Sequence, residues 1–298
     1  MANKGIMKKN IGIGKSHGKI ILIGEHSVVY GYPAISLPLK NIEVICKISP
    51  SESLFRFKKN DTLSTAIFSA LDYLKISKPR ISYNIVSSVP EKRGMGSSAA
   101  VSIAAIRAVF DYYNETIDDT TLELLTNQAE IIAHVNPSGL DAKTCLNDKA
   151  IKFIRNVGFL NLPIDLNAFL VIADTGIQGH TREAIKKVES LEEKAIPHLK
   201  RLGELANIIE ESLKTKDVYN IGQAMTAAHK TLRQLGVSAK ESDHLVNVAI
   251  KNGALGSKMT GGGLGGCIIA ICQTQKEAEE ISFQLEKEGA IKTWIEAL

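Results

Sequence analysis

A segment rich in glycine and serine at residues 92–98 combines residue types that suit the binding of an anion. Apart from Met95, its members are small, carry a hydroxyl group or are positively charged: Lys92, Arg93, Gly94, Met95, Gly96, Ser97 and Ser98. Glycines let the backbone adopt positive φ and come close to a bulky ligand. A helix that begins at the serines would direct its free N–H groups at the segment. We therefore interpret it as a phosphate-binding loop, with a plain glycine turn before a buried helix as the alternative.

This loop matches neither of two common nucleotide-binding patterns. It lacks the Gly-Lys-Ser/Thr ending of the P-loop and the Gly-x-Gly-x-x-Gly spacing of dinucleotide-binding folds. The residues that follow it, 99–109, are almost continuously apolar, as expected for a buried helix.

Three more charged residues lie at positions that suggest a role in catalysis or binding. Lys19 opens a buried strand, Glu130 lies in an otherwise apolar helix, and Asp141 follows the turn-forming residues 136–139. Each has a structural alternative: a strand-edge lysine with its amine in solvent, a solvated helix position, and a turn-capping aspartate. Glu25 and His26 lie in the turn after the strand of Lys19, where His26 could also be a plain turn histidine.

Hydrophobic periodicity predicts a mixture of strands and helices. Strands are predicted at residues 19–24, 33–37, 41–48, 81–86, 150–154, 159–162 and 169–173, followed by two strands joined by a glycine loop at 261–266 and a short strand or tail at 291–298. Helices are predicted at 63–74, 98–113, 121–134, 238–253 and 276–288, with two or three more within 181–235, where Pro197 marks a kink or a helix start. A composition shift at 163–180 indicates a domain boundary.

Composition narrows the class of protein. The chain has 298 residues, 44% hydrophobic and 23% charged, with a net charge of +4 spread along it, which gives no strong support to nucleic-acid binding. Its four cysteines form no C-x-x-C pair, which is typical of reduced structural thiols. With neither a signal peptide nor an apolar run of the ~18 residues that a membrane span requires, we expect a cytoplasmic protein.

Three segments in order resemble the motifs of the galactokinase, homoserine kinase, mevalonate kinase and phosphomevalonate kinase (GHMP) family. They are Gly18-Lys-Ile-Ile-Leu-Ile-Gly-Glu-His26, the loop at 92–98, and Gly261-Gly-Gly-Leu-Gly-Gly266. The first segment is most similar to the mevalonate kinases of the family, since phosphomevalonate kinases more often have Glu-Tyr-Ala at Glu25-His26-Ser27. The resemblance covers almost the whole chain.

The resemblance implies an α+β fold of two domains. Residues 1–168 would form an N-terminal domain like the second domain of ribosomal protein S5, and residues 169–298 a C-terminal ferredoxin-like domain. It also implies ATP and Mg²⁺ as cofactors and mevalonate as the substrate, whose primary hydroxyl would be phosphorylated to 5-phosphomevalonate in isoprenoid precursor synthesis. A homodimer is expected from the family alone.

The resemblance also assigns roles to residues. Asp141 and Lys19 would be catalytic, and Mg²⁺ would be bound by Ser98 and Glu130. The ATP phosphates would be bound by Lys92, Arg93, Gly94, Met95, Gly96, Ser97, Ser98 and Gly261. The acceptor would be contacted by Glu25, His26, Thr181 and Gly262.

Two departures from the family pattern and two rival functions stay open. Many relatives have glycine at Lys92, some have alanine at Gly262, and Leu264 interrupts the last glycine loop. One rival function is a family kinase with another acceptor, such as phosphomevalonate or a sugar. The other is a non-catalytic nucleotide-binding or S5-like nucleic-acid-binding protein.

Overall fold

The computed structural model describes residues 8–133 and 139–298. The chain divides into two compact units that are interleaved in sequence. Unit 1 contains the residues up to Lys19 together with Pro38–Glu91 and Gly96–Asp148, and unit 2 contains Ile20–Leu37, Lys92–Met95 and Lys149–Leu298. The phosphate-binding loop is therefore split, with residues 92–95 in unit 2 and residues 96–98 in unit 1. The expected domain boundary between residues 168 and 169 stays a prediction.

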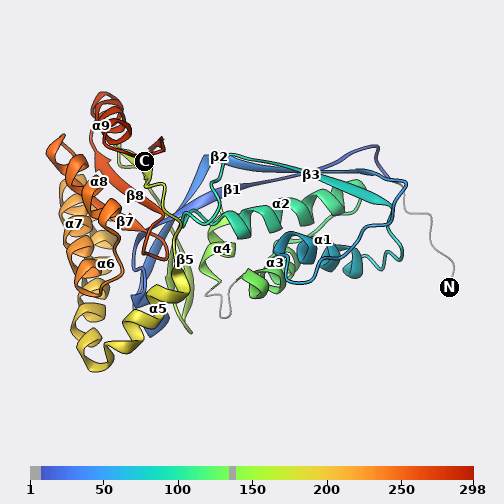
Figure 1. Cartoon of the computed structure of the whole chain (residues 1–298), viewed down its shortest axis with the longest axis horizontal. Helices are drawn as coiled ribbons and strands as arrows, with labels where there is room; N and C mark the ends of the chain where they lie inside the picture. Colours follow the sequence, from blue (N-terminus) through green and yellow to red (C-terminus); the bar gives the residue numbers. More distant parts are fainter. Residues whose placement is uncertain (1–7, 134–138) are drawn as a thin grey trace. The chain divides into compact units, whose positions relative to one another are not determined.

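Unit 1 contains a layer of helices on a sheet. Its strands belong to β1 (Gly12–Ile23), β2 (Ala34–Pro50) and β3 (Ile81–Ser87), and β1 and β2 also contribute residues to unit 2. Its helices are α1 (Thr62–Tyr73), α2 (Ser97–Tyr112), α3 (Asp119–Ala133) and α4 (Leu140–Leu146). These helices lie along one face of the strands (Figure 1), and α2 is almost entirely buried.

Two glycines explain why β1 begins earlier than the predicted strand at 19–24. A Cβ atom on Gly12 would lie 2.4 Å from the carbonyl oxygen of Ala108, and one on Gly14 would lie 2.0 Å from that of Ala104. Both glycines are thus required by the close approach of the strand to α2. The predicted start of this strand at residue 19 was therefore too late.

The strands predicted at 33–37 and 41–48 are one long strand, β2. Its first part, Ala34 to Ser36, pairs with β4 (Ala150–Ile154), and its later part, Val44 to Pro50, pairs with β3. Pro38 falls between these two paired regions, where its missing N–H removes no hydrogen bond to β3 or β4.

Unit 2 is built on an antiparallel sheet of strand order β7-β8-β6-β9. The strands are β6 (Phe169–Asp174), β7 (Gly256–Thr260), β8 (Cys267–Cys272) and β9 (Lys292–Ala297). Helices α8 (Lys240–Lys251) and α9 (Gln275–Lys287) cover one face, where Leu245 and Ile281 join a buried cluster with Val171 of β6 and Ile268 of β8. Figure 1 shows these helices beside the sheet.

The remaining helices of unit 2 are α5 (Thr181–Ser190), α6 (Ile196–Thr215) and α7 (Val218–Gln234), with the short 3-10 helices η1 (Ser27–Tyr30) and η2 (Glu192–Ala195). Pro197 lies in the first turn of α6, so the predicted helix start is confirmed. The helices predicted at 63–74, 98–113 and 276–288 are confirmed to within one residue at each end. The short helix α4 was not predicted, and the turn predicted at 136–138 lies outside the described residues.

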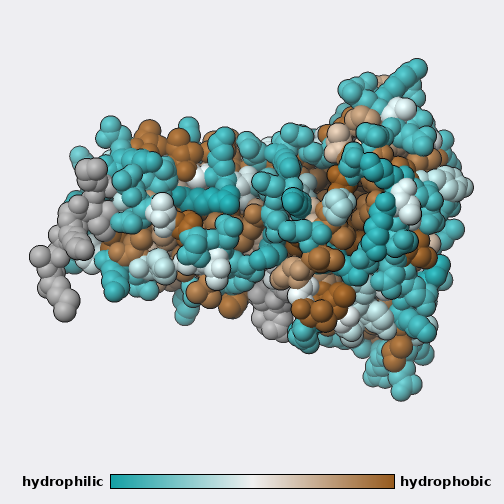
Figure 2. Space-filling view, turned by 180° about the vertical axis from the view of Figure 1, so that it is seen from behind, coloured by the Kyte–Doolittle hydropathy of each residue, from teal (hydrophilic) through white to brown (hydrophobic). Residues whose placement is uncertain are grey.

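The strand β5 (Gly158–Leu162) stands last in the order β1-β2-β4-β5. Four of its five residues are exposed, in keeping with an edge position. On the face shown in Figure 2, hydrophobic residues form separate patches within a largely hydrophilic surface. Among the described helices, none is both long and apolar enough to cross a membrane.

Candidate active site

Lys19 and Asp141 form an ion pair within unit 1. Lys19 Nζ lies 2.8 Å from Asp141 Oδ1, and the lysine side chain is 2% exposed. Gly96 makes room for it, because a Cβ there would lie 2.7 Å from Lys19 Cγ. The lysine is therefore no strand-edge residue with its amine in solvent. Asp141 is in the first turn of α4, and its side chain is 35% exposed, so its carboxylate is held on one side and accessible on the other.

Ser98 and Glu130 form a second polar pair in unit 1. Ser98 is in the first turn of α2, and its Oγ donates a hydrogen bond to Glu130 Oε1 over 2.5 Å. Glu130 is 2% exposed, which excludes the solvated helix position. Burial raises the pKa of its carboxyl to about 7; the charge of Asp141 adds to this rise, whereas the hydrogen bond from Ser98 and the charge of Lys19 oppose it.

This pair suits a hard cation. Burial disfavours the charged form of this carboxylate, which a cation would stabilise, and a hydroxyl beside a carboxylate supplies the oxygen ligands that Mg²⁺ prefers. Within residues 8–133 and 139–298, no group of three or more His, Cys, Asp or Glu could hold a metal. Such a full set is not required, because Mg²⁺ keeps several waters and commonly shares phosphate oxygens.

The part of the loop in unit 2 is tied down by backbone and side-chain contacts. The Nε of Arg93 lies 2.9 Å from Oδ1 of Asp174, and its Nη2 donates to the carbonyl of Gly176. The carbonyl of Lys92 accepts a hydrogen bond from Gly179 N–H, while the Lys92 side chain is exposed. Met95 is fully buried. The Arg93 side chain is thus bound by Asp174 and Gly176 of unit 2, and a contact of Arg93 with phosphate stays a prediction.

Gly94 and Gly261 meet backbone to backbone. Both have positive φ, 80° and 85°, and a Cβ on Gly261 would lie 2.6 Å from Gly94 Cα. Gly96 also has a positive φ of 70°. The positive φ predicted for the two loop glycines, Gly94 and Gly96, is confirmed. Gly261, which also has a positive φ, brings the last glycine loop into contact with Gly94.

Glu25 and His26 are buried in the turn after β1. The Glu25 carboxylate is paired with Lys258 of β7, and both side chains are fully buried. His26 has a φ of 62°, and burial followed by the charge of Lys258 lowers its pKa to about 4. Its Nε2 is buried and has no hydrogen-bond partner among the described residues. The ring is therefore neutral at physiological pH.

Thr181 and Gly262 also lie side by side in unit 2. Thr181 is the first residue of α5, and a Cβ on Gly262 would lie 1.9 Å from its Oγ1. The neighbouring His180 N–H donates to the carbonyl of Gly263 over 3.0 Å. The threonine occupies the space that an alanine would need, which accounts for glycine at this position in this chain.

Lys258 is the residue that the sequence analysis missed. It lies in the predicted strand before the last glycine loop, and a lysine in a buried strand was the signal that had singled out Lys19. Nothing local in the sequence indicates its partner, since Glu25 is 233 residues away.

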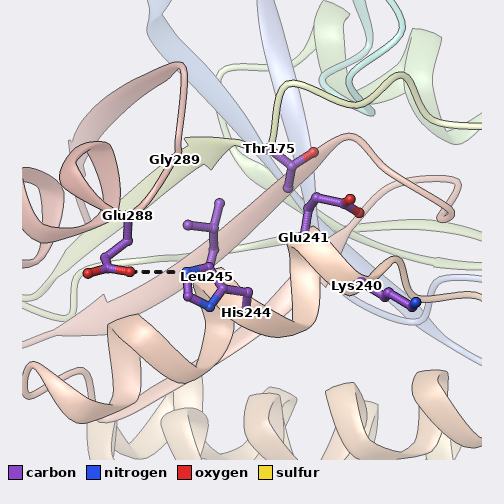
Figure 3. Close-up of a pocket in the computed structure, with 7 residues that line it drawn as sticks. All are labelled: Thr175, Lys240, Glu241, His244, Leu245, Glu288 and Gly289. Atoms are coloured by element: carbon purple, nitrogen blue, oxygen red, sulfur yellow. Dashed lines mark ion pairs between the residues drawn. The ribbon is translucent and has the colours of Figure 1, made fainter.

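A separate pocket of about 310 Å³ lies on unit 2 (Figure 3). Its lining is Thr175, Lys240, Glu241, His244, Leu245, Glu288 and Gly289. His244 Nε2 lies 3.3 Å from Glu288 Oε2 at one side of it. None of these seven residues is a predicted site residue, and their exposed charges of both signs favour no one ligand.

Comparison with known proteins identifies the class of this chain. The family models "GHMP kinases N terminal domain" and "GHMP kinases C terminal" match residues 63–148 and 209–291. A curated protein of Methanocaldococcus jannaschii, named mevalonate kinase, is 30% identical over 301 residues, which span 91% of this chain and 94% of the relative. The chain therefore belongs to the GHMP kinase family.

Solved structures agree with this assignment. The L. major mevalonate kinase in complex with R-mevalonate superposes with a TM-score of 0.85 at 25% identity, over 99% of this chain and 98% of the other. The mevalonate kinase of methicillin-resistant Staphylococcus aureus MRSA252 gives 0.78 at 30% identity, over 97% and 99%. The expected α+β GHMP kinase fold is confirmed.

Proposed function

We propose that this GHMP kinase transfers the γ-phosphoryl group of ATP to the primary hydroxyl of mevalonate, giving 5-phosphomevalonate and ADP. The names of its relatives support the choice of acceptor. The observation that carries the proposal is the pairing of buried Lys19 with Asp141 at the positions that match the family's catalytic residues.

Asp141 would take the proton of the attacking hydroxyl. The ammonium group of Lys19 lies 2.8 Å from Oδ1 of this carboxylate and holds it in place. The exposed side of Asp141 leaves an oxygen free to accept a hydrogen bond from a substrate. Lys19 would hold this carboxylate in place and favour the alkoxide that forms as the proton leaves.

The start of α2 would bind the triphosphate. Its first N–H groups have no partner within the helix, and the positive end of the helix dipole favours an anion there. Gly94, Gly96 and Gly261 lack the side chains that would keep phosphate away from the backbone. Lys92, an exposed residue of the same loop, would supply positive charge.

Ser98 and Glu130 would hold Mg²⁺ through a hydroxyl and a carboxylate oxygen. The ion would neutralise the charge on the β- and γ-phosphates during transfer. Ionised Glu130 is unfavourable in its buried site, and a cation would relieve that cost.

Glu25, His26, Thr181 and Gly262 would form the acceptor side of the site. A neutral histidine offers one donor and one acceptor nitrogen, and His26 Nε2 is buried without a partner among the described residues. The Thr181 hydroxyl offers a second polar contact. Such groups raise the affinity for a ligand that can hydrogen-bond to them and lower it for one that cannot.

A coupled assay of ADP release over a panel of acceptors tests the proposal. The purified protein should turn over mevalonate with a higher kcat/KM than phosphomevalonate, galactose or homoserine. Better turnover of another acceptor would replace the proposed substrate, and absence of ADP release with every acceptor would favour the non-catalytic alternative. The cytoplasmic location and the homodimer stay predictions.

A further inference from the structure

A buried ion pair anchors the turn after β1 that contains Glu25 and His26. Lys258 Nζ donates hydrogen bonds to Glu25 Oε1 and to the carbonyl of Met259, and both Lys258 and Glu25 are fully buried as side chains. Burial lowers the pKa of Lys258, and the charge of Glu25 opposes that effect. Because neither charge reaches water, each depends on the other for compensation.

Residues of α7 and α8 hold the backbone of β7 next to Lys258. The backbone N–H of Met259 donates to His229 Nδ1 over 3.3 Å, and His229 Nε2 lies 3.2 Å from Asp243 Oδ1. Asp243 is held in turn by Arg233, whose Nε lies 2.8 Å from Oδ2. The cluster therefore fixes the strand that carries the lysine.

The same strand holds the end of β1. Thr260 Oγ1 accepts a hydrogen bond from Ile21 N–H and donates one to the Ile21 carbonyl, over 3.1 and 2.8 Å. Two residues of β7 that are two positions apart, Lys258 and Thr260, thus bind the turn and the strand that position His26. No motif used for the proposed function includes either residue.

We propose that Lys258 is a positioning residue that holds Glu25 and, through it, the turn that presents His26 to the acceptor substrate. The proposal rests on the proposed function in one respect, the contact of Glu25 and His26 with the acceptor. The charged and titratable groups of the cluster are Glu25, His26, His229, Arg233, Asp243 and Lys258.

A double-mutant cycle tests the coupling. Lys258→Met should raise KM for mevalonate by about tenfold and leave KM for ATP within about twofold, because the coupling of contacting charges is commonly worth a factor of this size. In the Glu25→Gln background the same change should have less than about a third of that effect. Lys276→Met is the matched control, since its side chain is 86% exposed and lies elsewhere in unit 2.

Two results of the cycle would overturn the proposal. One is an equal effect of Lys258→Met in both backgrounds, and the other is an equal rise in KM for ATP. If Lys258→Met alone does not fold, the neutral pair Glu25→Gln/Lys258→Met leaves no uncompensated charge. A wild-type KM for mevalonate in that folded double variant would also refute the positioning role.

An NMR titration gives a readout that needs no substrate. The His26 ring signal, assigned by its loss in His26→Gln, should titrate near pH 4 in the wild-type protein. Loss of the Lys258 charge should move that midpoint upward, toward the ordinary value of 6.5. An unchanged midpoint in Lys258→Met would overturn the inference, whichever acceptor the protein phosphorylates. If the midpoint shifts as expected but the protein does not turn over mevalonate, only the proposed function is refuted.

Discussion

The contact between Gly261 and Gly94 makes a quantitative prediction about the last glycine loop. Alanine at Gly261 would place its Cβ 2.6 Å from Gly94 Cα at a φ of 85°. Left-handed backbone costs an alanine roughly 1–2 kcal/mol, and an extra atom forced into a packed contact costs about 1–3 kcal/mol more. We therefore expect Gly261→Ala to lower the free energy of unfolding by about 2–5 kcal/mol.

Gly236 offers a matched control. Its φ is 73°, but a Cβ there would meet no atom within 4 Å. Gly236→Ala should therefore show only the backbone cost, about 1–2 kcal/mol. The difference between the two variants isolates the steric contact with Gly94.

Urea denaturation measures the loss of unfolding free energy in both variants. It can be followed by the fluorescence of Trp294, the single tryptophan, which lies in β9 of the same unit. Gly261→Ala should also raise KM for ATP, because it displaces the loop proposed to bind phosphate, whereas Gly236→Ala should not. Equal losses of stability with equal KM values for ATP would refute the reasoning.

Three further predictions concern the proposed chemistry and the buried histidines. Asp141→Asn should reduce turnover by about 10²–10⁴-fold while calorimetry shows ATP binding largely intact, because the amide cannot accept a proton; near-normal turnover would contradict its role. Ser98→Ala and Glu130→Gln should each raise the Mg²⁺ concentration for half-maximal turnover by removing an oxygen ligand, and an unchanged metal titration would count against both. His26 and His229 have a pKa of about 4 in the folded protein against an ordinary 6.5, so the unfolded chain binds more protons between these values. Stability should therefore fall by up to about 3 kcal/mol per histidine as the pH drops through that window, and a flat profile in urea denaturation would be inconsistent with this.

Features set by local chemistry could be predicted from the sequence. The positive φ of Gly94 and Gly96 follows from a glycine loop before an apolar helix, and α2 begins at Ser97, one residue before the predicted start. Likewise, a glycine loop joins β7 and β8 as the two flanking apolar runs indicated. In each case the signal and its structural consequence lie within a few residues of each other.

Features set by distant partners could not be predicted. The need for glycine at Gly12 and Gly14 is visible only once the helix that packs on them is known, because contact with α2 leaves no room for a Cβ. Arg93 resembled a phosphate ligand, yet its guanidinium is engaged by Asp174, 81 residues away. Lys258 had no visible role without Glu25. Sequence spacing carries no information about such pairings.

The central claim, that this chain phosphorylates the primary hydroxyl of mevalonate, is tested most directly by identifying the product. Mevalonate labelled with ¹³C at the primary alcohol carbon would be incubated with ATP, Mg²⁺ and the purified protein. We expect a single phosphate ester whose ³¹P signal is coupled to the labelled carbon, formed in equal amount to ADP. A phosphate on another hydroxyl, or ADP without any ester, would contradict it.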